Sequence, residues 1–215
     1  MQKFDNFIFD WDGTLADSPA LHEKAFRKVL SEDLPEALSN FDYTAVSGCT
    51  TREVFANLCR ATPPEKQEEL VHKKQALYRR MIEEGQLNLL DGARALLSFL
   101  KSQNKWLFLV TGGSRGSVEK AINATDVSCF FSGIITADDI NHGKPNPESF
   151  LLCINNFNLN SAKSVVIEDA QKGVAAAHAA GLYAVGVHDL AVKEQADVWF
   201  RTIPCFLSVL QKERG

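Results

Sequence analysis

Short apolar runs alternate with amphipathic stretches over most of the chain. The apolar runs predict strands, and the stretches with a 3.6-residue period predict helices. After a first strand at 6–9, the predicted elements from residue 91 onward are a helix at 92–102, a strand at 106–110, a helix at 117–123, a strand at 133–136, a helix from 146, a strand at 164–167, an alanine-rich helix ending at 181, strands at 183–187 and 197–200, and a helix from 204. This alternation, with strands that are apolar throughout, favours an α/β fold with a doubly wound parallel sheet.

The stretch between the first two strands has only helical patterns. A helix at 19–31 has its apolar residues on one face, Thr50 and Glu53 form a capping box that opens a helix to about residue 61, and a third helix runs from 64 to 84. We therefore predict two domains: residues 1–16 with 86–215 form the α/β core, and residues 17–85 form an inserted all-α domain.

Composition excludes several classes of protein. The chain has 215 residues, 45% of them hydrophobic, and a net charge of −4, so it lacks the basic surplus of a nucleic-acid-binding protein. Its apolar runs are far shorter than the roughly 20 residues of a membrane span, and no secretory signal is visible. Five cysteines without C-x-x-C spacing suit reduced thiols. We expect a cytoplasmic protein, a monomer or weak homodimer, without nucleic-acid or membrane partners.

Polar residues follow several of the predicted strands. In parallel sheets, ligands bind at the carboxyl ends of the strands, so residues at these points should meet at one edge. The residues found there, or in the loop before the helix at 146, are Asp10, Asp12, Thr111, Gly112, Lys144, Glu168 and Asp169.

These residues predict a site for Mg²⁺ and a phosphoryl group. Carboxylates packed together repel each other unless a cation neutralises them, and an all-oxygen ligand set favours Mg²⁺ over zinc. Lys144, Thr111 and the amides of the glycine loop that includes Gly112 are suited to hold phosphate oxygens. Asp10 can attack phosphorus and form an aspartyl phosphate, while Asp12 protonates the leaving oxygen and later activates water.

The same motifs resemble those of the haloacid dehalogenase superfamily. D-W-D-G-T is similar to its D-x-D-G-T/V motif, and Thr111, Lys144 in G-K-P-N-P and Glu168-Asp169 in V-V-I-E-D follow in the family's order. The resemblance implies a Rossmann-like core with a helical cap domain. It also implies that Asp10, the Asp12 carbonyl and Asp169 hold Mg²⁺, with Glu168 nearby, and that Thr111 and Lys144 hold phosphate.

The insertion is similar to the cap of the β-phosphoglucomutase-like branch, whose members include sugar-phosphate phosphatases and mutases. The passages DSPALHEKAFRKVL and FLLCINNFN resemble bacterial fructose 1-phosphate phosphatases most. In this branch, positions that match His22 and Lys74 lie where the cap meets the core.

Three residues of the insertion are candidate substrate contacts. His22 and Lys74 fall at the centres of apolar helix faces, where polar groups need partners such as substrate hydroxyls, or an anionic group. Arg52 falls near a cap arginine of the mutases, but it lies one residue further from the preceding glycine. That offset turns a helical side chain by about 100°, which disfavours the grip on a second phosphate that a mutase needs.

Each signal also has a simpler interpretation. Asp10 and Asp12 could form a turn before Gly13, Lys144 could be a solvated loop lysine, His22 a core histidine, and Arg52 a surface ion-pair residue. Two other classes, a dinucleotide-binding protein and a phospho-accepting receiver module, fit the glycine spacing and the inserted domain poorly. The sequence therefore predicts a Mg²⁺-dependent phosphatase of a small phosphorylated metabolite, with a sugar phosphate as the expected substrate class. The alternative is a β-phosphoglucomutase-type sugar phosphomutase.

Overall fold

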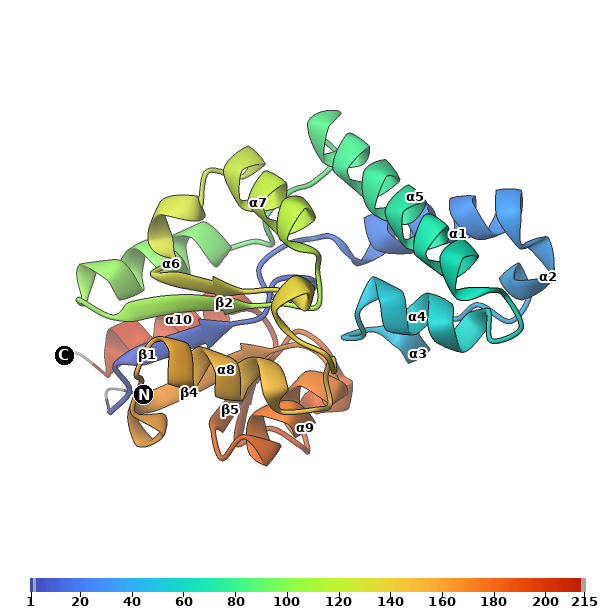
Figure 1. The fold of residues 1–215 in the computed structure, drawn as a ribbon. Coiled ribbons are helices and arrows are strands. Elements are labelled where there is room, and N and C mark those ends of the chain that lie inside the picture. The colour runs from blue at the N-terminus through green and yellow to red at the C-terminus, as the bar shows by residue number, and fades with distance from the viewer. Residues whose placement is uncertain (2, 214–215) are drawn as a thin grey trace.

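The core of the protein is a six-stranded parallel sheet with the order β3-β2-β1-β4-β5-β6, seen in a computed structural model that describes residue 1 and residues 3–213 (Figure 1). The strands are β1 Asn6–Phe9, β2 Trp106–Val110, β3 Gly133–Ile135, β4 Ser164–Glu168, β5 Tyr183–Val187 and β6 Val198–Phe200. The predicted α/β, doubly wound fold is confirmed.

The central strand β1 is apolar from Phe7 to Phe9 because both of its faces are covered. Phe7 and Phe9 point into one hydrophobic cluster and Ile8 points into another, as the two-residue period of a strand requires. Helices α6, α7 and α10 supply the first cluster, and α8 and α9 supply the second. The helices around the sheet are α6 Ala93–Ser102, α7 Arg115–Ala124, α8 Glu148–Asn156, α9 Gln171–Ala179 and α10 Ile203–Lys212, with short 3₁₀ turns η1 Ser128–Phe130, η2 Ala137–Asp139, η3 Ser161–Lys163 and η4 Leu190–Val192.

Of the helices described between β1 and β2, all but α6 form a second layer at one end of the sheet (Figure 1). They are α1 Pro19–Asp33, α2 Pro35–Leu38, α3 Tyr43–Val46, α4 Thr51–Leu58 and α5 Pro64–Glu83. Phe26, Phe55 and Leu70 belong to a hydrophobic cluster of their own in this layer. Tyr78, Met81 and Ile82, near the end of α5, instead join the cluster of the sheet. We call these helices the cap; its bounds at 17 and 85 stay a prediction.

Helix α4 ends three residues before its predicted end, because the chain turns there toward α5. Thr62 N donates to Cys59 O at 2.8 Å, and the Gln67 side chain donates to the carbonyls of Cys59 and Thr62 at 2.9 Å each. These bonds satisfy carbonyl groups that the helix leaves free. The four-residue helices α2 and α3 were not predicted, since a single turn has no detectable period.

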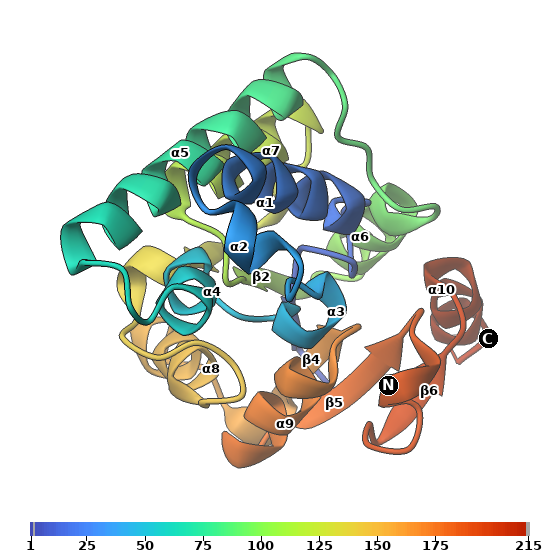
Figure 2. The ribbon, with the colours of Figure 1, turned by 90° about the vertical axis from the view of Figure 1, so that its right-hand side faces the viewer.

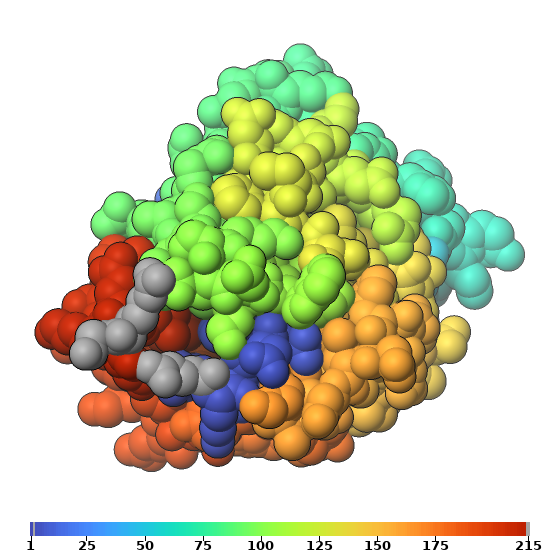
Figure 3. Space-filling view, turned by 90° about the vertical axis from the view of Figure 1, so that its left-hand side faces the viewer, coloured from blue at the N-terminus to red at the C-terminus, as the bar shows by residue number. Residues whose placement is uncertain are grey.

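The end of the sheet away from the cap holds both ends of the described chain. In Figure 3 the first residues lie beside α6 and the last helix. The amino group of Met1 lies 2.8 Å from a carboxylate oxygen of Glu213. No helix in the described residues is both long and apolar enough to cross a membrane.

Candidate active site

Asp10 and Asp12 stand at the carboxyl end of β1, in the middle of the sheet. Asp10 continues the ladder, since its N–H donates to Ile167 O on β4 at 3.0 Å. The chain then turns sharply at Gly13, whose φ of 84° lies in the left-handed region. A Cβ at this position would lie 2.2 Å from Asp169 Oδ2, so only glycine brings the turn this close to the second acidic strand end.

Three carboxylates converge at this edge. One oxygen each of Asp10, Glu168 and Asp169 lies within 4.8 Å of the others. Burial, followed by the charge of Glu168, raises the pKa of Asp10 well above its ordinary value. The same two causes raise the pKa of Asp169 to about 7, although Thr14 donates a hydrogen bond to Asp169 Oδ1 at 2.8 Å. The site therefore favours an additional positive charge.

Lys144 supplies one such positive charge to the acids. Its Nζ lies 2.6 Å from Asp10 Oδ1 and 2.5 Å from Glu168 Oε1, and donates to Val110 O at 3.2 Å. Burial by itself would lower the pKa of Lys144, but Asp10 and Glu168 hold it above its ordinary value. Lys144 is thus a charged side chain that fixes two of the three acids.

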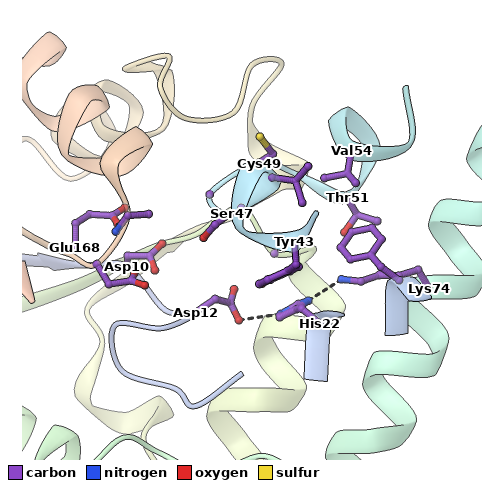
Figure 4. Close-up of a pocket in the computed structure, with 17 residues that line it drawn as sticks. Asp10, Asp12, His22, Tyr43, Ser47, Cys49, Thr51, Val54, Lys74 and Glu168 are labelled. Atoms are coloured by element: carbon purple, nitrogen blue, oxygen red, sulfur yellow. Dashed lines mark hydrogen bonds and ion pairs between the residues drawn. The ribbon is translucent and has the colours of Figure 1, made fainter. Parts of the chain in front are cut away.

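Asp12 is bonded to the cap instead. Its Oδ1 accepts from Ser18 Oγ at 2.5 Å and lies 2.9 Å from His22 Nε2, as Figure 4 shows for His22. Burial would raise the pKa of Asp12, but His22, Ser18 and the charge of Lys74 lower it to about 2. Asp12 is therefore ionised. Its Oδ2 has one long contact, 3.4 Å from Thr111 Oγ1.

His22 connects Asp12 to Lys74. His22 Nδ1 lies 2.6 Å from Lys74 Nζ (Figure 4). Burial, and then Lys74, lower the pKa of His22 in spite of Asp12, so the imidazole is neutral. When Lys74 is an ammonium it donates to Nδ1, which places the imidazole proton on Nε2, where it is donated to Asp12.

Lys74 is 2% exposed, which is exceptional for a lysine. Burial lowers its pKa to about 7, although Asp12 acts in the opposite direction. Its Nζ also lies 4.3 Å from the ring centre of Phe26 and 5.3 Å from that of Tyr78. Aromatic faces and one imidazole nitrogen replace the water that an exposed ammonium would have.

A cavity of about 50 Å³ lies between the acids and the cap. From the core, its lining includes Asp10, Asp12, Gly112 and Asp169; from the cap it includes Tyr43, Ser47, Cys49 and Thr51 (Figure 4). Thr111 and Lys144 are not part of this lining, but each contacts a carboxylate that is, Asp12 and Asp10 respectively. The cavity is therefore lined by residues of both the sheet edge and the cap helices.

The predicted residues of the sheet edge are all brought together, and His22 and Lys74 join them from the cap. Arg52 is not among the residues that line the cavity. Its guanidinium pairs with Glu68 on α5 through bonds of 2.8 and 3.1 Å, and its side chain is 66% exposed. The structure thus places Arg52 in the surface ion pair that was its simpler interpretation.

Sequence reasoning missed Ser18 and Tyr43. Ser18 occupies the position before α1 that usually caps a helix, yet its hydroxyl is used by Asp12 and makes no capping bond. Tyr43 lines the cavity from the short helix α3, where burial and then the charge of Asp12 raise its pKa. The polar D-S-P sequence before α1 was a usable signal for Ser18; Tyr43 had none.

Comparison with known proteins identifies similar chains. The family model described as haloacid dehalogenase-like hydrolase matches residues 7–187. A fructose-1-phosphate phosphatase of Escherichia coli is 31% identical over 86% of this chain and 97% of its own length. A validoxylamine A 7'-phosphate phosphatase of Streptomyces hygroscopicus subsp. limoneus is 29% identical over 91% of this chain and 92% of its own. The solved structure of a β-phosphoglucomutase from Clostridium difficile has a TM-score of 0.85 at 23% identity, covering 98% of this chain and 96% of that one, which is a likeness of fold.

The close approach of Gly13 to Asp169 predicts that Gly13→Ala is unusually harmful. The positive φ alone costs a non-glycine residue about 1–2 kcal/mol, and the added Cβ must also displace the buried Asp169 carboxylate. Gly181→Ala is the matched control, because Gly181 has a φ of 72° with no atom within 4 Å of its Cβ position. Urea denaturation should show a larger loss of unfolding free energy for Gly13→Ala; equal losses would contradict the prediction.

The burial of Lys74 predicts a pH-dependent stability. Because its pKa falls from 10.5 to about 7 on folding, the folded state binds this proton less tightly than the unfolded chain does. Burial of the charged ammonium therefore destabilises the folded state by its full amount below pH 7, and this destabilisation disappears as the pH rises toward 10.5. Relative to Lys74→Met, the wild-type protein should gain stability between pH 7 and pH 9.5 in urea denaturation. A pH-independent difference would show that Lys74 is charged in both states.

Proposed function

The chain belongs to the haloacid dehalogenase-like hydrolase family, and on this basis we propose that it is a Mg²⁺-dependent phosphatase of a small sugar phosphate, acting through an aspartyl phosphate on Asp10. The observation that carries the proposal is the cluster of Asp10, Glu168 and Asp169 with Lys144 bonded to two of them. The phosphatases among its relatives support the reaction class.

The acidic cluster fits a magnesium ion. All its donors are carboxylate oxygens, which Mg²⁺ prefers. Burial, followed by the charge of Glu168, raises the pKa values of Asp10 and Asp169 even with Lys144 beside them. Asp10 and Asp169 would hold the ion, with the Asp12 carbonyl and with Glu168 beside it. When bound, Mg²⁺ neutralises the acids and draws a phosphate oxygen toward them.

Asp10 is the proposed nucleophile. Its backbone is held in the ladder between β1 and β4, and Lys144 fixes its Oδ1, so Oδ2 is the oxygen available for attack on phosphorus. The bond from Asp10 to phosphorus forms as the bond to the ester oxygen breaks. Thr111, the Gly112 amide and Lys144 are proposed to hold the phosphate oxygens, because Gly112 lines the cavity while Lys144 and Thr111 contact the Asp10 and Asp12 carboxylates that also line it.

Asp12 is the proposed acid and base. Ser18 and His22 occupy its Oδ1, which leaves Oδ2 to exchange a proton with the ester oxygen and later with water. Its pKa of about 2 makes it a base in the free protein. It becomes an acid only when the negative charge of a bound phosphate ester raises that pKa. The proton is then released to the leaving alcohol.

The surroundings of the cavity favour hydrolysis over the mutase reaction. Among the described residues that line it, the cationic side chain is Lys74, and its ammonium is already engaged by His22 and two aromatic rings. Arg52 is paired with Glu68. A second phosphate group would therefore lack a cation, whereas the polar groups of Tyr43 and Ser47 suit sugar hydroxyls.

A sugar phosphate needs more room than this arrangement offers. Pockets for small ligands usually measure about 300–1,000 Å³, whereas the cavity here measures about 50 Å³. We propose that the cap separates from the core to admit substrate and then closes to exclude water from Asp10. We further propose a cytoplasmic enzyme, since all five cysteines are free thiols, that works as a monomer or weak homodimer.

Replacement of the nucleophile tests this proposal. Asp10→Asn keeps an acceptor for Lys144 but loses the attacking carboxylate, so phosphate release should fall by at least about 1,000-fold with the fold intact. Phosphate release should be measured over a panel of phosphomonoesters, with EDTA and Mg²⁺ controls and glucose 1-phosphate isomerisation in parallel. Activity that survives Asp10→Asn would exclude this nucleophile, and isomerisation without release would favour the mutase.

The raised pKa of Asp169 predicts that Mg²⁺ binding depends on pH. With a pKa of about 7 the carboxyl must lose a proton to bind the ion below neutral pH. Mg²⁺ affinity should therefore rise from pH 6 to pH 8, with proton release seen by calorimetry in buffers of different ionisation enthalpy. Asp169→Asn should weaken binding and reduce its pH dependence; an affinity that is constant over this range would argue against the assigned site.

A further inference from the structure

Glu53, in the first turn of α4, bonds to the cap and to the core at the same time. Its Oε2 accepts from Thr50 N at 2.8 Å and from Thr50 Oγ1 at 2.9 Å, which completes the capping box of α4. Its other oxygen, Oε1, accepts from Gly143 N at 2.8 Å. Gly143 directly precedes Lys144, so a carboxylate of the cap holds the backbone beside the buried lysine of the site.

The loop before Lys144 takes its hydrogen-bond acceptors from two domains. The N–H groups of Asn141 and His142 donate to the Glu148 carboxylate at 2.8 and 3.0 Å, within the core. The next N–H, that of Gly143, has its acceptor on the cap. Because Gly143 is buried beneath Glu53, movement of α4 away from the core would remove this acceptor.

Gly143 is shaped to the Glu53 carboxylate. A Cβ at position 143 would lie 2.3 Å from Glu53 Oε2, and its three nearest atoms would all be atoms of that carboxylate. The Gly143 backbone and the Glu53 carboxylate are therefore in direct contact where the cap meets the core, and a methyl group on Gly143 would separate them.

The neighbouring cap segment also rests on the core. On α9, Lys172 Nζ donates to Ala45 O at 2.8 Å and lies 3.1 Å from Cys49 Sγ. Figure 2, which views the cap side, shows α3 and α4 across the end of the sheet, above α8 and α9. Glu53 and Lys172 thus bond this segment of the cap to the core at two separate points.

We propose that Glu53 is a positioning residue for the phosphatase reaction, a latch through which the closed cap orients the loop that carries Lys144. The proposal rests on the proposed function and adds a residue to it. Opening of the cap breaks the bond from Gly143 N to Glu53 and frees the loop; closing restores it once substrate is enclosed. Lys144 is then held to Asp10 and Glu168 at the moment of attack, when small displacements are costly.

A double-mutant cycle tests the latch. Glu53→Ala removes the acceptor, and Gly143→Ala displaces the carboxylate from the core side while the sequence of α4 stays unchanged. Each should lower kcat/KM for the best phosphomonoester about tenfold or more, the effect of one hydrogen bond to a charged group. Gly116→Ala, at an exposed helical glycine with no atom within 4 Å of its Cβ position, is the control and should match wild type.

The double variant gives the decisive comparison. Once the Glu53 carboxylate is removed, the methyl group of Gly143→Ala no longer clashes with it. The double variant Glu53→Ala with Gly143→Ala should therefore have the same kcat/KM as Glu53→Ala alone. If the fold-losses of kcat/KM in the two single variants multiply in the double variant, Gly143→Ala acts on the loop itself and the latch is refuted. Wild-type activity in Gly143→Ala would refute it as well.

Amide hydrogen exchange by NMR provides a readout that does not depend on activity. In Glu53→Ala, the amide of Gly143 should exchange at least about tenfold faster, while those of Asn141 and His142, bonded to Glu148, stay unchanged. Unchanged exchange at Gly143 would overturn the proposal. If the wild-type protein releases no phosphate from any ester, the proposed function fails, and the exchange experiment still decides whether Glu53 holds this loop.

Discussion

Repulsion among buried carboxylates at the end of the sheet is the constraint on which the rest of the site depends. Asp10 and Asp169 stand beside each other because β1 and β4 are neighbours in the sheet, and Glu168 ends β4 itself. Burial removes the water that would screen them, so positive charge has to be supplied. Lys144 supplies it to Asp10 and Glu168, and the pKa of Asp169, at about 7, indicates that one more cation is favoured.

The negative charge of Asp12 is stabilised by side chains of the cap rather than by Lys144. Its charge is held by Ser18 and His22 at the start of the cap and, through His22, by Lys74 on α5. The proton affinity of this core residue therefore depends on where the cap lies. Helix α5, which carries Lys74, links the cap to the core: residues near its end pack into the hydrophobic cluster of the sheet, while its first half packs within the cap.

The sequence predicted the elements best where burial is continuous. The strands β1, β2 and β5 have their predicted bounds, since a strand covered on both faces is a nearly continuous apolar run. The end of α4 was misplaced because the side chain of Gln67, eight residues after Cys59, stabilises the turn there. For the site, residues that follow strands were recognisable by position, whereas Tyr43 was not, since its helix α3 is a single turn. Ser18 was missed although its partner Asp12 lies only six residues before it, because a serine at that position is expected to cap the helix instead.

The sequence by itself determined which chemical groups reach the edge of the sheet, because the acids and Thr111 follow their strands closely along the chain and the parallel sheet aligns the strand ends. Lys144 was recognisable instead from its loop before α8. Only the tertiary structure decided which partner each group takes: Lys144 for Asp10, which lies 134 residues away, His22 with Lys74 for Asp12, and Glu68 for Arg52. The physical reason is that periodicity and turn chemistry act over a few residues, whereas a hydrogen bond between distant residues is set by how the packed layers bring their side chains together.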